Sequence, residues 1–393
     1  MSNSADRGSM RPRRESGTPS EGARARGRRS SGARASTLAA SLGGGDNALN
    51  LVRVVLASMV VLGHALPLGG FAPVVLGPFV YGGWHGAAVD AFFAISGFLI
   101  VRSALRMRAR GFLWRRVLRI YPGYVVALVV TAFVIAPASI PWGMHWDAGE
   151  ALRYVLGSLP LKTRDLPVHG DVPFPLTWNG SLWTLFYEAL AYLGALIAVS
   201  LPVVRRYPRA STTSAAAVLW VGWLVIASGL LGEVPAGPLS GYLVNILRFG
   251  VHFACGAALF AWGDRLRASW WAAGPALVAS LVILSVPATG ALAALLPMLL
   301  ALGVLQVGAL LPLRIGSEND LSYGIYVYAF PVQQMLVVLG VNRWGLLITA
   351  LASLVCVIPF AAASWFLVEK PAMRLRSLVP AVPRAPDAPA RRP

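Results

Sequence analysis

The sequence is short of charge and of cysteine. Of its 393 residues, 13% are charged, 56% are hydrophobic and only two are cysteines. A soluble domain cannot enclose so much apolar surface in one core. Cys255 and Cys356 each lie inside an apolar run without a histidine at metal-ligand spacing, so we predict neither a disulfide framework nor a metal site. The composition predicts a protein whose solvent is largely lipid.

Apolar runs of membrane-spanning length recur along the chain, since one span needs about 20 residues at a rise of about 1.5 Å each. Pro, Gly and charged residues separate the runs, and the sequence has no internal repeat. A further apolar stretch, 74–81, is too short to span, and we interpret it as interfacial or re-entrant. We predict an all-α polytopic bundle of about ten transmembrane helices, at residues 49–66, 87–101, 124–140, 182–201, 215–231, 242–262, 270–286, 291–311, 321–339 and 346–368.

The positive charge of the chain is distributed as in a membrane protein. A net charge of +18 could indicate nucleic acid binding, but the basic residues lie in the tails and between the apolar runs. With the N-terminus inside, the short inner loops hold thirteen basic residues and the outer loops four. Because cytoplasmic loops carry an excess of Lys and Arg, we predict that both termini are cytoplasmic. Membrane lipid, and no nucleic acid, is the expected partner.

The two ends of the chain differ from its middle. Residues 1–47 are rich in Arg, Ser and Gly and lack apolar periodicity, so they cannot bury enough surface to offset the entropy of ordering. We predict a disordered basic cytoplasmic tail there, and favour it over a transit peptide because no cleavage signature precedes the first run. A transmembrane domain at 48–371 and a basic, Pro-rich cytoplasmic tail at 372–393 complete the expected organisation.

Five ionisable residues within the runs are candidates for function, because a charge in hydrocarbon is costly. Arg53 and His64 are eleven residues apart, which places them on one stripe of a helix about 16 Å apart along its axis. Arg53 would lie near the inner surface and His64 near the outer one. Counting from the ends of the runs, Asp90, Glu188 and Arg248 would share the outer third of the membrane with His64.

A histidine can take a proton from a hydroxyl group, and a carboxylate can hold its ring in the correct tautomer. His64 with Glu188 or Asp90 would suit that chemistry, although an interfacial histidine can also serve as a helix cap. Glu188 and Arg248 could instead form a structural salt bridge that cancels two buried charges. His252, one turn from Arg248, would support them through hydrogen bonds.

Seven arginines lie between residues 102 and 121 on the inner side. Arg116 and Arg119 have the i, i+3 spacing that puts both guanidinium groups on one side of a helix. Such groups bind phosphates through charge-assisted, bidentate bonds. The alternative is ordinary anchoring on anionic lipid.

A series of short motifs runs along almost the whole of residues 49–371, in a fixed order. The series resembles the acyltransferase 3 family, bacterial multi-spanning enzymes that O-acylate cell-surface carbohydrates and some small glycosylated metabolites. The motifs are Arg53 followed after ten residues by His64, VDAFFAISGFLI (89–100), FLWRRVLRIYP (112–122), NGSLWTLFYEALAY (179–192), LSYGIYVYAFPV (321–332) and FLVEKP (366–371).

The resemblance implies roles for residues within these motifs. His64 would act on an acceptor at the outer side, with Glu188 also essential, and acyl-CoA, expected to be acetyl-CoA, would be held from the cytoplasmic side. The residues implied for the donor are Arg53, Arg116, Arg119 and Tyr121. The residues implied as support are Asp90, Ser96, Trp183 and Arg248. We expect Arg248 to stabilise the oxyanion of the thioester intermediate or to balance Glu188.

Two departures from the family pattern concern the end of the chain. The family often has a histidine where this sequence has Ala329, so no catalytic role is assigned to the run at 321–339. Some relatives carry an appended extracytoplasmic hydrolase-like domain, and this chain resembles the stand-alone members. The expected location is the bacterial cytoplasmic membrane.

The expected function is transfer of an acyl group to a hydroxyl of an exopolysaccharide, a wall polymer or a lipid-linked glycan, alongside glycan-biosynthesis partners. Transfer could be direct or pass through an acyl-histidine, and a small glycosylated metabolite is an alternative acceptor. A transporter or flippase of a glycan or small molecule is the rival class, although no inverted repeat supports it. A membrane scaffold or sensor that retains the fold without chemistry is a third alternative.

Overall fold

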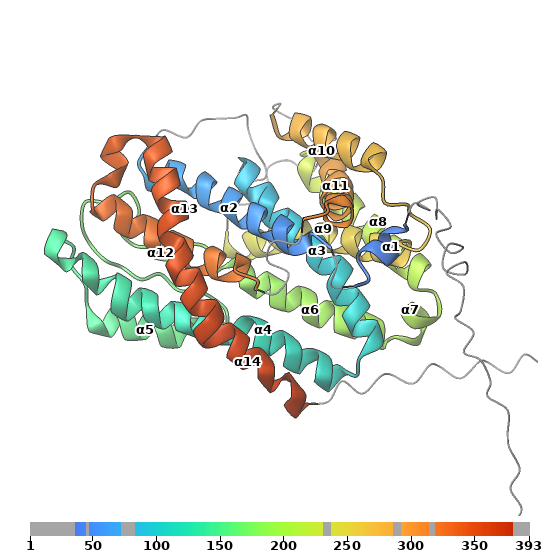
Figure 1. Cartoon of the computed structure of the whole chain (residues 1–393), viewed down its shortest axis with the longest axis horizontal. Helices are drawn as coiled ribbons and strands as arrows, with labels where there is room; N and C mark the ends of the chain where they lie inside the picture. The colour runs from blue at the N-terminus through green and yellow to red at the C-terminus, as the bar shows by residue number, and fades with distance from the viewer. Residues whose placement is uncertain are drawn as a thin grey trace, which may run out of the picture. The chain divides into compact units, whose positions relative to one another are not determined.

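The computed structural model describes residues 36–44, 47–71, 83–230, 237–285, 292–313 and 319–379. Every named element within these ranges is helical (Figure 1). The α-helices are α1 (Leu38–Ser41), α2 (Leu49–Leu68), α3 (Gly83–Arg106), α4 (Ala109–Val130), α5 (Ala148–Ser158), α6 (Thr184–Ser200), α7 (Pro202–Arg206), α8 (Pro208–Ala227), α9 (Pro238–Ala261), α10 (Trp270–Ser285), α11 (Leu296–Leu310), α12 (Ser322–Val338), α13 (Leu346–Ala363) and α14 (Lys370–Arg374). The shorter 3₁₀ and π elements are η1 (Thr131–Ile135), η2 (Pro137–Trp142), η3 (Ala293–Leu295), η4 (Val341–Trp344), η5 (Ser364–Glu369) and η6 (Leu375–Leu378).

A helix lies over each of the ten predicted spans, and the all-α polytopic bundle is confirmed. Within the described ranges, 7 helices are long and apolar enough to cross a membrane. The helices α6 and α10 are apolar but shorter, and α12 has 17 residues, so the count of ten stays a prediction. The segment predicted at 74–81 lies outside the described residues. The 7 long helices are Leu49–Leu68, Gly83–Arg106, Ala109–Trp142, Pro208–Ala227, Leu239–Ala261, Ala293–Leu310 and Leu346–Leu378.

The ends of the helices meet in two groups. In the group predicted to be cytoplasmic, the N–H of Ala48, just before α2, donates to the carbonyl of Gly308 near the end of α11 at 2.9 Å. In the opposite group, Asn342 Nδ2 donates to the carbonyl of Gly69, just after α2, at 3.1 Å. This grouping agrees with helices that alternate in direction, while the side on which the termini lie stays a prediction.

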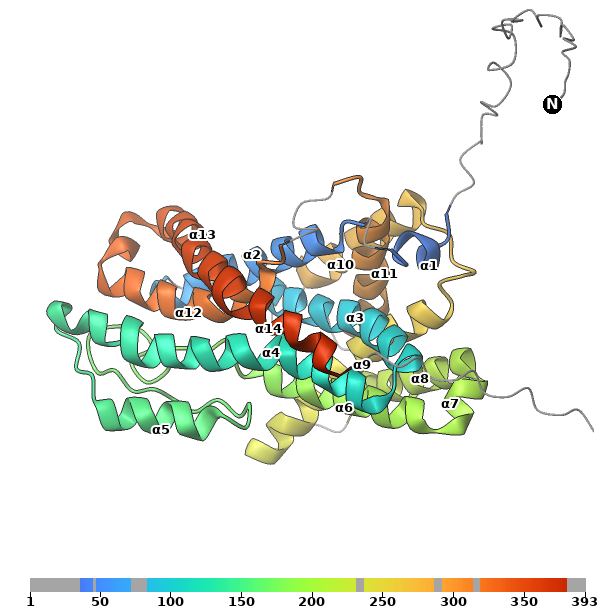
Figure 2. The ribbon, with the colours of Figure 1, turned by 60° about the horizontal axis from the view of Figure 1, so that its bottom comes forward.

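Both predicted tails contain packed residues at the ends nearer the bundle. Leu38 of α1 is fully buried, and its N–H donates to the carbonyl of Leu266 at 2.8 Å. At the other end, Trp114 Nε1 donates to the carbonyl of Leu375 at 2.9 Å, and α14 lies across α4 (Figure 2). The boundaries predicted at 47 and 372 are therefore wrong for 36–44 and for 372–379. Apolar side chains of 36–44 are buried on the bundle, and the backbone of 372–379 is bonded to α4. Residues 1–35 and 380–393 lie outside the described residues.

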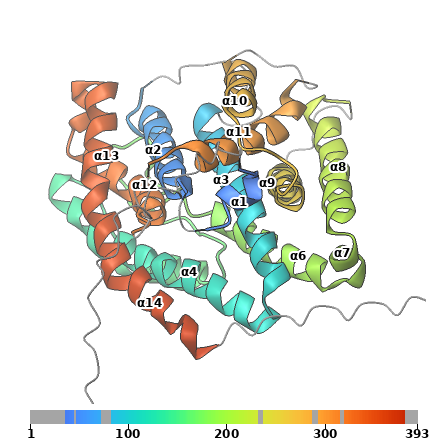
Figure 3. The ribbon, with the colours of Figure 1, turned by 45° about the vertical axis from the view of Figure 1, so that its right-hand side comes forward.

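The closest helix crossing is between α3 and α9. A Cβ on Gly97 of α3 would lie 1.9 Å from the carbonyl oxygen of Phe253, and one on Gly256 of α9 would lie 1.9 Å from that of Ala94. Glycine at both positions lets the two backbones touch, as is typical of helix packing in membranes. On its other side α9 packs against α8 (Figure 3). The crossing brings the polar residues of α3 and α9 within reach of each other.

The segment before α6 is buried although it is not helical. Trp178 is fully buried, and Asn179 and Ser181 are 3% and 2% exposed. Asn179 Nδ2 donates to the carbonyl of Val327 in α12 at 3.0 Å, and the hydroxyl of Tyr326 donates to the carbonyl of Ser181 at 2.9 Å. Irregular backbone at such a depth is tolerated where protein satisfies its polar groups. The helix α6 therefore begins inside the protein and not at its surface.

Candidate active site

A cavity of about 120 Å³ lies where α2, α3, α4, α6 and α12 meet. Five of the residues predicted for the site line it, from four of these helices: Arg53, Ser96, Arg116, Arg119 and Glu188. The shared face that the i, i+3 spacing predicts for Arg116 and Arg119 is therefore present. We call this space the central cavity.

Two carboxylates that the sequence analysis did not select hold the arginines of the central cavity. Asp320, which precedes α12, accepts hydrogen bonds from Arg53 and from Arg119, the latter at 2.5 Å. Glu369, in the π turn η5, lies 3.3 Å from Arg119 and accepts a bond of 2.9 Å from Ser364. These contacts join α2, α4, α12 and η5 around buried charges.

The electrostatics of Asp320 follow from this arrangement. Burial would by itself raise the pKa of the Asp320 carboxyl, but the Arg53 and Arg119 guanidinium groups and hydrogen bonds from Ser322 outweigh it and hold the pKa below its usual range. The carboxylate is therefore charged at neutral pH and cancels positive charge at the cavity wall.

Arg116 lies against aromatic rings, whereas Arg53 and Arg119 are paired with a carboxylate. Its guanidinium lies over the rings of Phe112 and Tyr192, at 5.9 Å and 5.8 Å from their centroids. Within the described ranges it makes no ion pair, and its Nε is buried without a hydrogen-bond partner. Arg116 therefore has charge and donors to offer to an anionic ligand.

Glu188 lines the central cavity and accepts a hydrogen bond from the hydroxyl of Tyr192, one turn along α6. We predicted that Glu188 shares an outer layer with His64, and this is wrong: Glu188 lies at the level of Arg53, Arg116 and Arg119. The error arises because the depth was counted from the end of the apolar run, whereas α6 begins inside the protein.

His64 lies away from the central cavity, next to a second histidine that the sequence analysis did not select. The rings of His64 and His85 have centroids 5.6 Å apart, and Phe330 of α12 lies edge-on to His64 at 5.5 Å. A Cβ on Gly63 would lie 2.3 Å from the Cβ of His85, so glycine at this position makes the notch that His85 occupies. We refer to His64 and His85 as the histidine pair.

The predicted carboxylate partner of His64 is absent from the described structure. Neither Glu188 nor Asp90 bonds to His64, and its Nδ1 is buried without a hydrogen-bond partner among the described residues. The prediction that one of these carboxylates holds the ring is therefore wrong. His85 takes the neighbouring position, and the glycine that precedes His64 is the signal that could have indicated a close helix contact there.

Asp90 belongs to a third cluster, with Arg248 and His252 of α9. Asp90 is fully buried, and Arg248 binds it through Nε at 2.9 Å and Nη2 at 3.1 Å. His252 Nδ1 donates to the carbonyl of Arg248 at 2.7 Å and lies 3.9 Å from Asp90. The suggestion that Arg248 balances Glu188 is wrong, because the crossing of α3 and α9 places Asp90 opposite it.

The other predicted residues lie outside the central cavity. Tyr121 is 37% exposed, with its nearest ring contact to Tyr124. Trp183 is 40% exposed and packs against Tyr187 and Phe249. Ala329 is buried in α12 between the cavity residue Tyr326 and Phe330.

The central cavity approaches the histidine pair along two helices. Val89 of α3 and Tyr326 of α12 line the cavity, and each stands four residues from a residue at the histidine pair, His85 and Phe330 respectively. Four residues are slightly more than one helical turn, or about 6 Å along the axis. The site therefore has arginines at one level and histidines at another, with the cavity between them.

Fold and site define a polytopic helical membrane protein with a basic internal cavity that extends towards a histidine pair. The family model described as an acyltransferase domain, Acyl_transf_3, matches residues 46–368. The chain belongs to the acyltransferase 3 family, as its motifs indicate, and is a membrane acyltransferase.

Two curated relatives match most of the chain. An O-acetyl transferase of Shigella phage Sf6 is 28% identical over 343 residues, which cover 83% of this chain and 95% of the relative. Nodulation protein 10 of Rhizobium leguminosarum bv. viciae is 28% identical over 360 residues, covering 85% of this chain and 95% of the relative. No solved structure matches the chain.

Proposed function

We propose that the protein transfers an acetyl group from acetyl-CoA, on the side predicted to be cytoplasmic, to a hydroxyl of a carbohydrate on the other side of the bacterial cytoplasmic membrane. An exopolysaccharide, a wall polymer or a lipid-linked glycan would be the acceptor. The name of the Sf6 relative, an O-acetyl transferase, supports the group and the atom that receives it. The observation that carries the proposal is the cavity between the arginines and the histidine pair.

The donor end of the reaction would lie at the central cavity. Arg116 offers unpaired donors to a phosphate, while Asp320 and Glu369 hold Arg119 in place beside it. Glu188, bonded to Tyr192, faces the same space and can accept from the amide N–H groups of the pantetheine arm. The arm would direct the thioester from this level towards the histidine pair.

The acceptor end of the reaction would lie at His64. The acceptor hydroxyl attacks the thioester carbon as a ring nitrogen of His64 takes its proton. The carbon–sulfur bond of the tetrahedral intermediate then breaks, and the CoA thiolate leaves and receives that proton. The products are the acetylated hydroxyl and CoA. Transfer of labelled acetyl to the protein without acceptor would instead indicate an acyl-histidine intermediate.

His85 would position His64 during the reaction through a hydrogen bond between ring nitrogens, the role expected of a carboxylate. In the structure the two rings are neighbours, with centroids 5.6 Å apart, and such bonds often form fully only when substrate is bound. We expect His85→Phe, which preserves the packing against Gly63 but removes the hydrogen-bonding nitrogens, to lower kcat about 10- to 100-fold through misorientation of the base. The KM for acetyl-CoA should stay the same, because the donor binds elsewhere. His85→Asn or His85→Gln, whose amides can replace one ring nitrogen, should retain more of kcat. Equal rates for the Phe variant and the unaltered protein would contradict this role.

The proposed function is tested by mass spectrometry of surface glycans. A strain that lacks the protein is compared with strains restored with the unaltered chain and with His64→Ala, at matched amounts in the membrane. Acetylation that returns only with the unaltered chain supports the function. Return of glycan export without any change in acetylation would indicate a transporter and refute it.

A further inference from the structure

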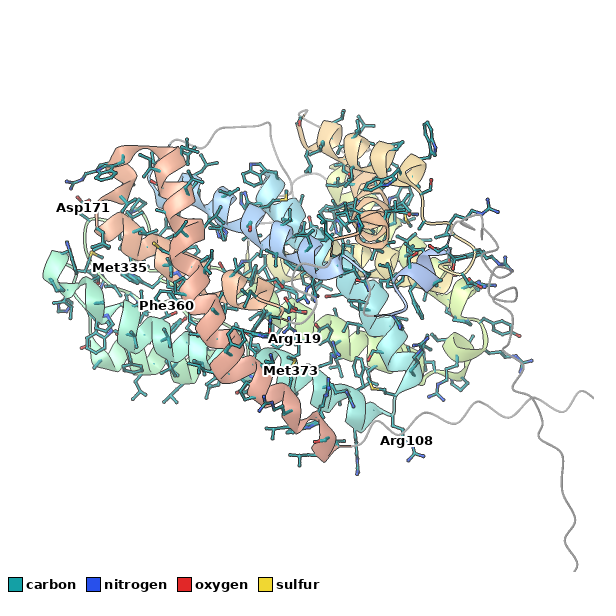
Figure 4. All side chains as sticks on the ribbon, in the orientation of Figure 1. Arg108, Arg119, Asp171, Met335, Phe360 and Met373 are labelled. Atoms are coloured by element: carbon teal, nitrogen blue, oxygen red, sulfur yellow. The ribbon has the colours of Figure 1, made fainter. Side chains whose placement is uncertain are left out.

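A second hollow shares Arg116 and Arg119 with the central cavity. Its volume is about 290 Å³, and Arg115, Arg376, Trp365 and Met373 line it together with those two arginines. Figure 4 labels Arg119 on α4 and Met373 on α14 beside it. We call this space the basic pocket. The family motifs imply donor binding for Arg116 and Arg119, but they give no role to Arg376, Trp365 or Met373.

The basic pocket has an excess of positive charge. Four arginines and one carboxylate, Asp320, line it, and Asp320 is already bound to Arg53 and Arg119. Within the described ranges Arg115, Arg116 and Arg376 form no ion pair, and the Nε atoms of Arg115 and Arg116 are buried without hydrogen-bond partners. Buried donors without partners are costly, so a ligand with several anionic oxygens would stabilise the pocket.

The C-terminal segment completes the pocket. Trp114 Nε1 of α4 donates to the carbonyl of Leu375 at 2.9 Å, which fixes η6 and with it Arg376 against α4. Trp365 is buried and is held through its Nε1 by Asn319 Oδ1 at 2.9 Å. With Met373, Trp365 supplies an apolar wall against which an adenine ring could pack.

The sizes and positions of the two spaces suit the two ends of one long ligand. The central cavity, at about 120 Å³, is less than half the volume of the basic pocket, at about 290 Å³. The smaller space suits a narrow acyl thioester arm, and the larger one suits the bulkier nucleotide. Arg116 and Arg119 line both spaces, whereas Arg115 and Arg376 line only the basic pocket. The arginines therefore form a series that begins with Arg116 and Arg119, which line both spaces, and continues with Arg115 and Arg376 in the basic pocket.

We infer that the basic pocket binds the nucleotide end of acyl-CoA, with the diphosphate at Arg115 and Arg116 and the 3′-phosphate at Arg376. The order follows from the ligand, in which the diphosphate adjoins the pantetheine arm and the 3′-phosphate lies beyond it. Arg376 then determines the preference for CoA over donors without that phosphate. The inference rests on the proposed function, which supplies the acyl-CoA donor.

The test is calorimetric binding of CoA and of dephospho-CoA, which lacks the 3′-phosphate, to the full chain purified in detergent. We expect the unaltered protein to prefer CoA. Arg376→Ala should bind CoA about tenfold more weakly and lose that preference, since one charge-assisted hydrogen bond is worth about that factor. Arg376→Lys, which keeps the positive charge, should retain part of the preference for CoA.

Arg374→Ala is the matched control, because Arg374 is exposed on α14 two residues earlier and does not line the pocket. It should keep the preference for CoA. An unchanged preference in Arg376→Ala, or an equal loss in Arg374→Ala, would overturn the inference while leaving the proposed function standing. If the unaltered protein binds neither compound, the proposed donor itself is wrong.

Discussion

We expect His64→Ala to lower the rate of acetyl transfer about 10²- to 10⁴-fold, the usual contribution of a general base. The alanine removes the ring nitrogens proposed to take the acceptor proton, while the central cavity, which His64 does not line, keeps its walls. The rate is measured with labelled acetyl-CoA and acceptor glycan in membranes, normalised to the amount of protein.

A histidine outside the site provides the matched control. His169 is exposed, and its backbone pairs with that of His145 through hydrogen bonds of 2.7 and 3.1 Å. Because a side-chain substitution leaves those bonds intact, His169→Ala should transfer acetyl at the unaltered rate. A His64→Ala protein that is present in the membrane and as fast as His169→Ala would remove His64 from the mechanism.

We expect Asp320→Asn to lower the free energy of unfolding by about 3–5 kcal/mol, the usual cost of breaking a buried ion pair by removing one partner. The substitution keeps the size of the side chain but leaves Arg53 and Arg119 without the carboxylate that they share. Chemical unfolding of the detergent-purified protein measures the change. Binding of CoA should weaken in parallel, because Arg119 loses one of its two anchors.

Asp264→Asn is the control for the loss of one carboxylate charge. Asp264 also pairs with an arginine, Arg209, but the side chain of Asp264 is 60% exposed. Solvent screens such pairs, so this substitution should leave stability nearly unchanged. If the two substitutions prove equally mild, the network around Asp320 does not stabilise the fold.

The same carboxylate predicts how stability depends on pH. Its folded-state pKa lies below the ordinary value of about 3.9. A lowered pKa means that the stabilising contribution is fully present above about pH 4 and is lost as the pH falls through the folded-state pKa. The difference in unfolding free energy between the unaltered protein and Asp320→Asn should therefore be constant from about pH 7 to pH 5 and shrink below about pH 4.

The fold was largely predictable because an apolar run of spanning length by itself indicates a membrane-spanning helix. A helix lies over each of the ten runs, and the stripe that joins Arg53 to His64 is present: Arg53 contacts Asp320 just before α12, and His64 contacts Phe330 within it. The helical periodicity of the sequence therefore correctly predicted which residues share one face of a helix.

The depth of a charged residue in the bundle and the identity of its ion-pair partner were less predictable, because both depend on contacts between distant segments. Glu188 was misplaced because nothing in the run at 182–201 shows that the segment before it is buried. Asp90 meets Arg248 because glycines let α3 and α9 cross closely, and a single sequence does not show which helices cross. Asp320 stands in a polar stretch before α12, and nothing in that stretch shows that Asp320 is buried or that it pairs with Arg53 and Arg119.

The carboxylate of Asp320 fastens three segments of the bundle to one another, and Glu369 adds a fourth. At that level the walls cannot move apart without separating opposite charges in a medium of low polarity. Under the proposed function, we expect any widening for a carbohydrate acceptor to occur at the opposite end of the site, beyond the histidine pair. The end at Arg53 and Arg119 would then be the more rigid of the two, because ion pairs join its walls.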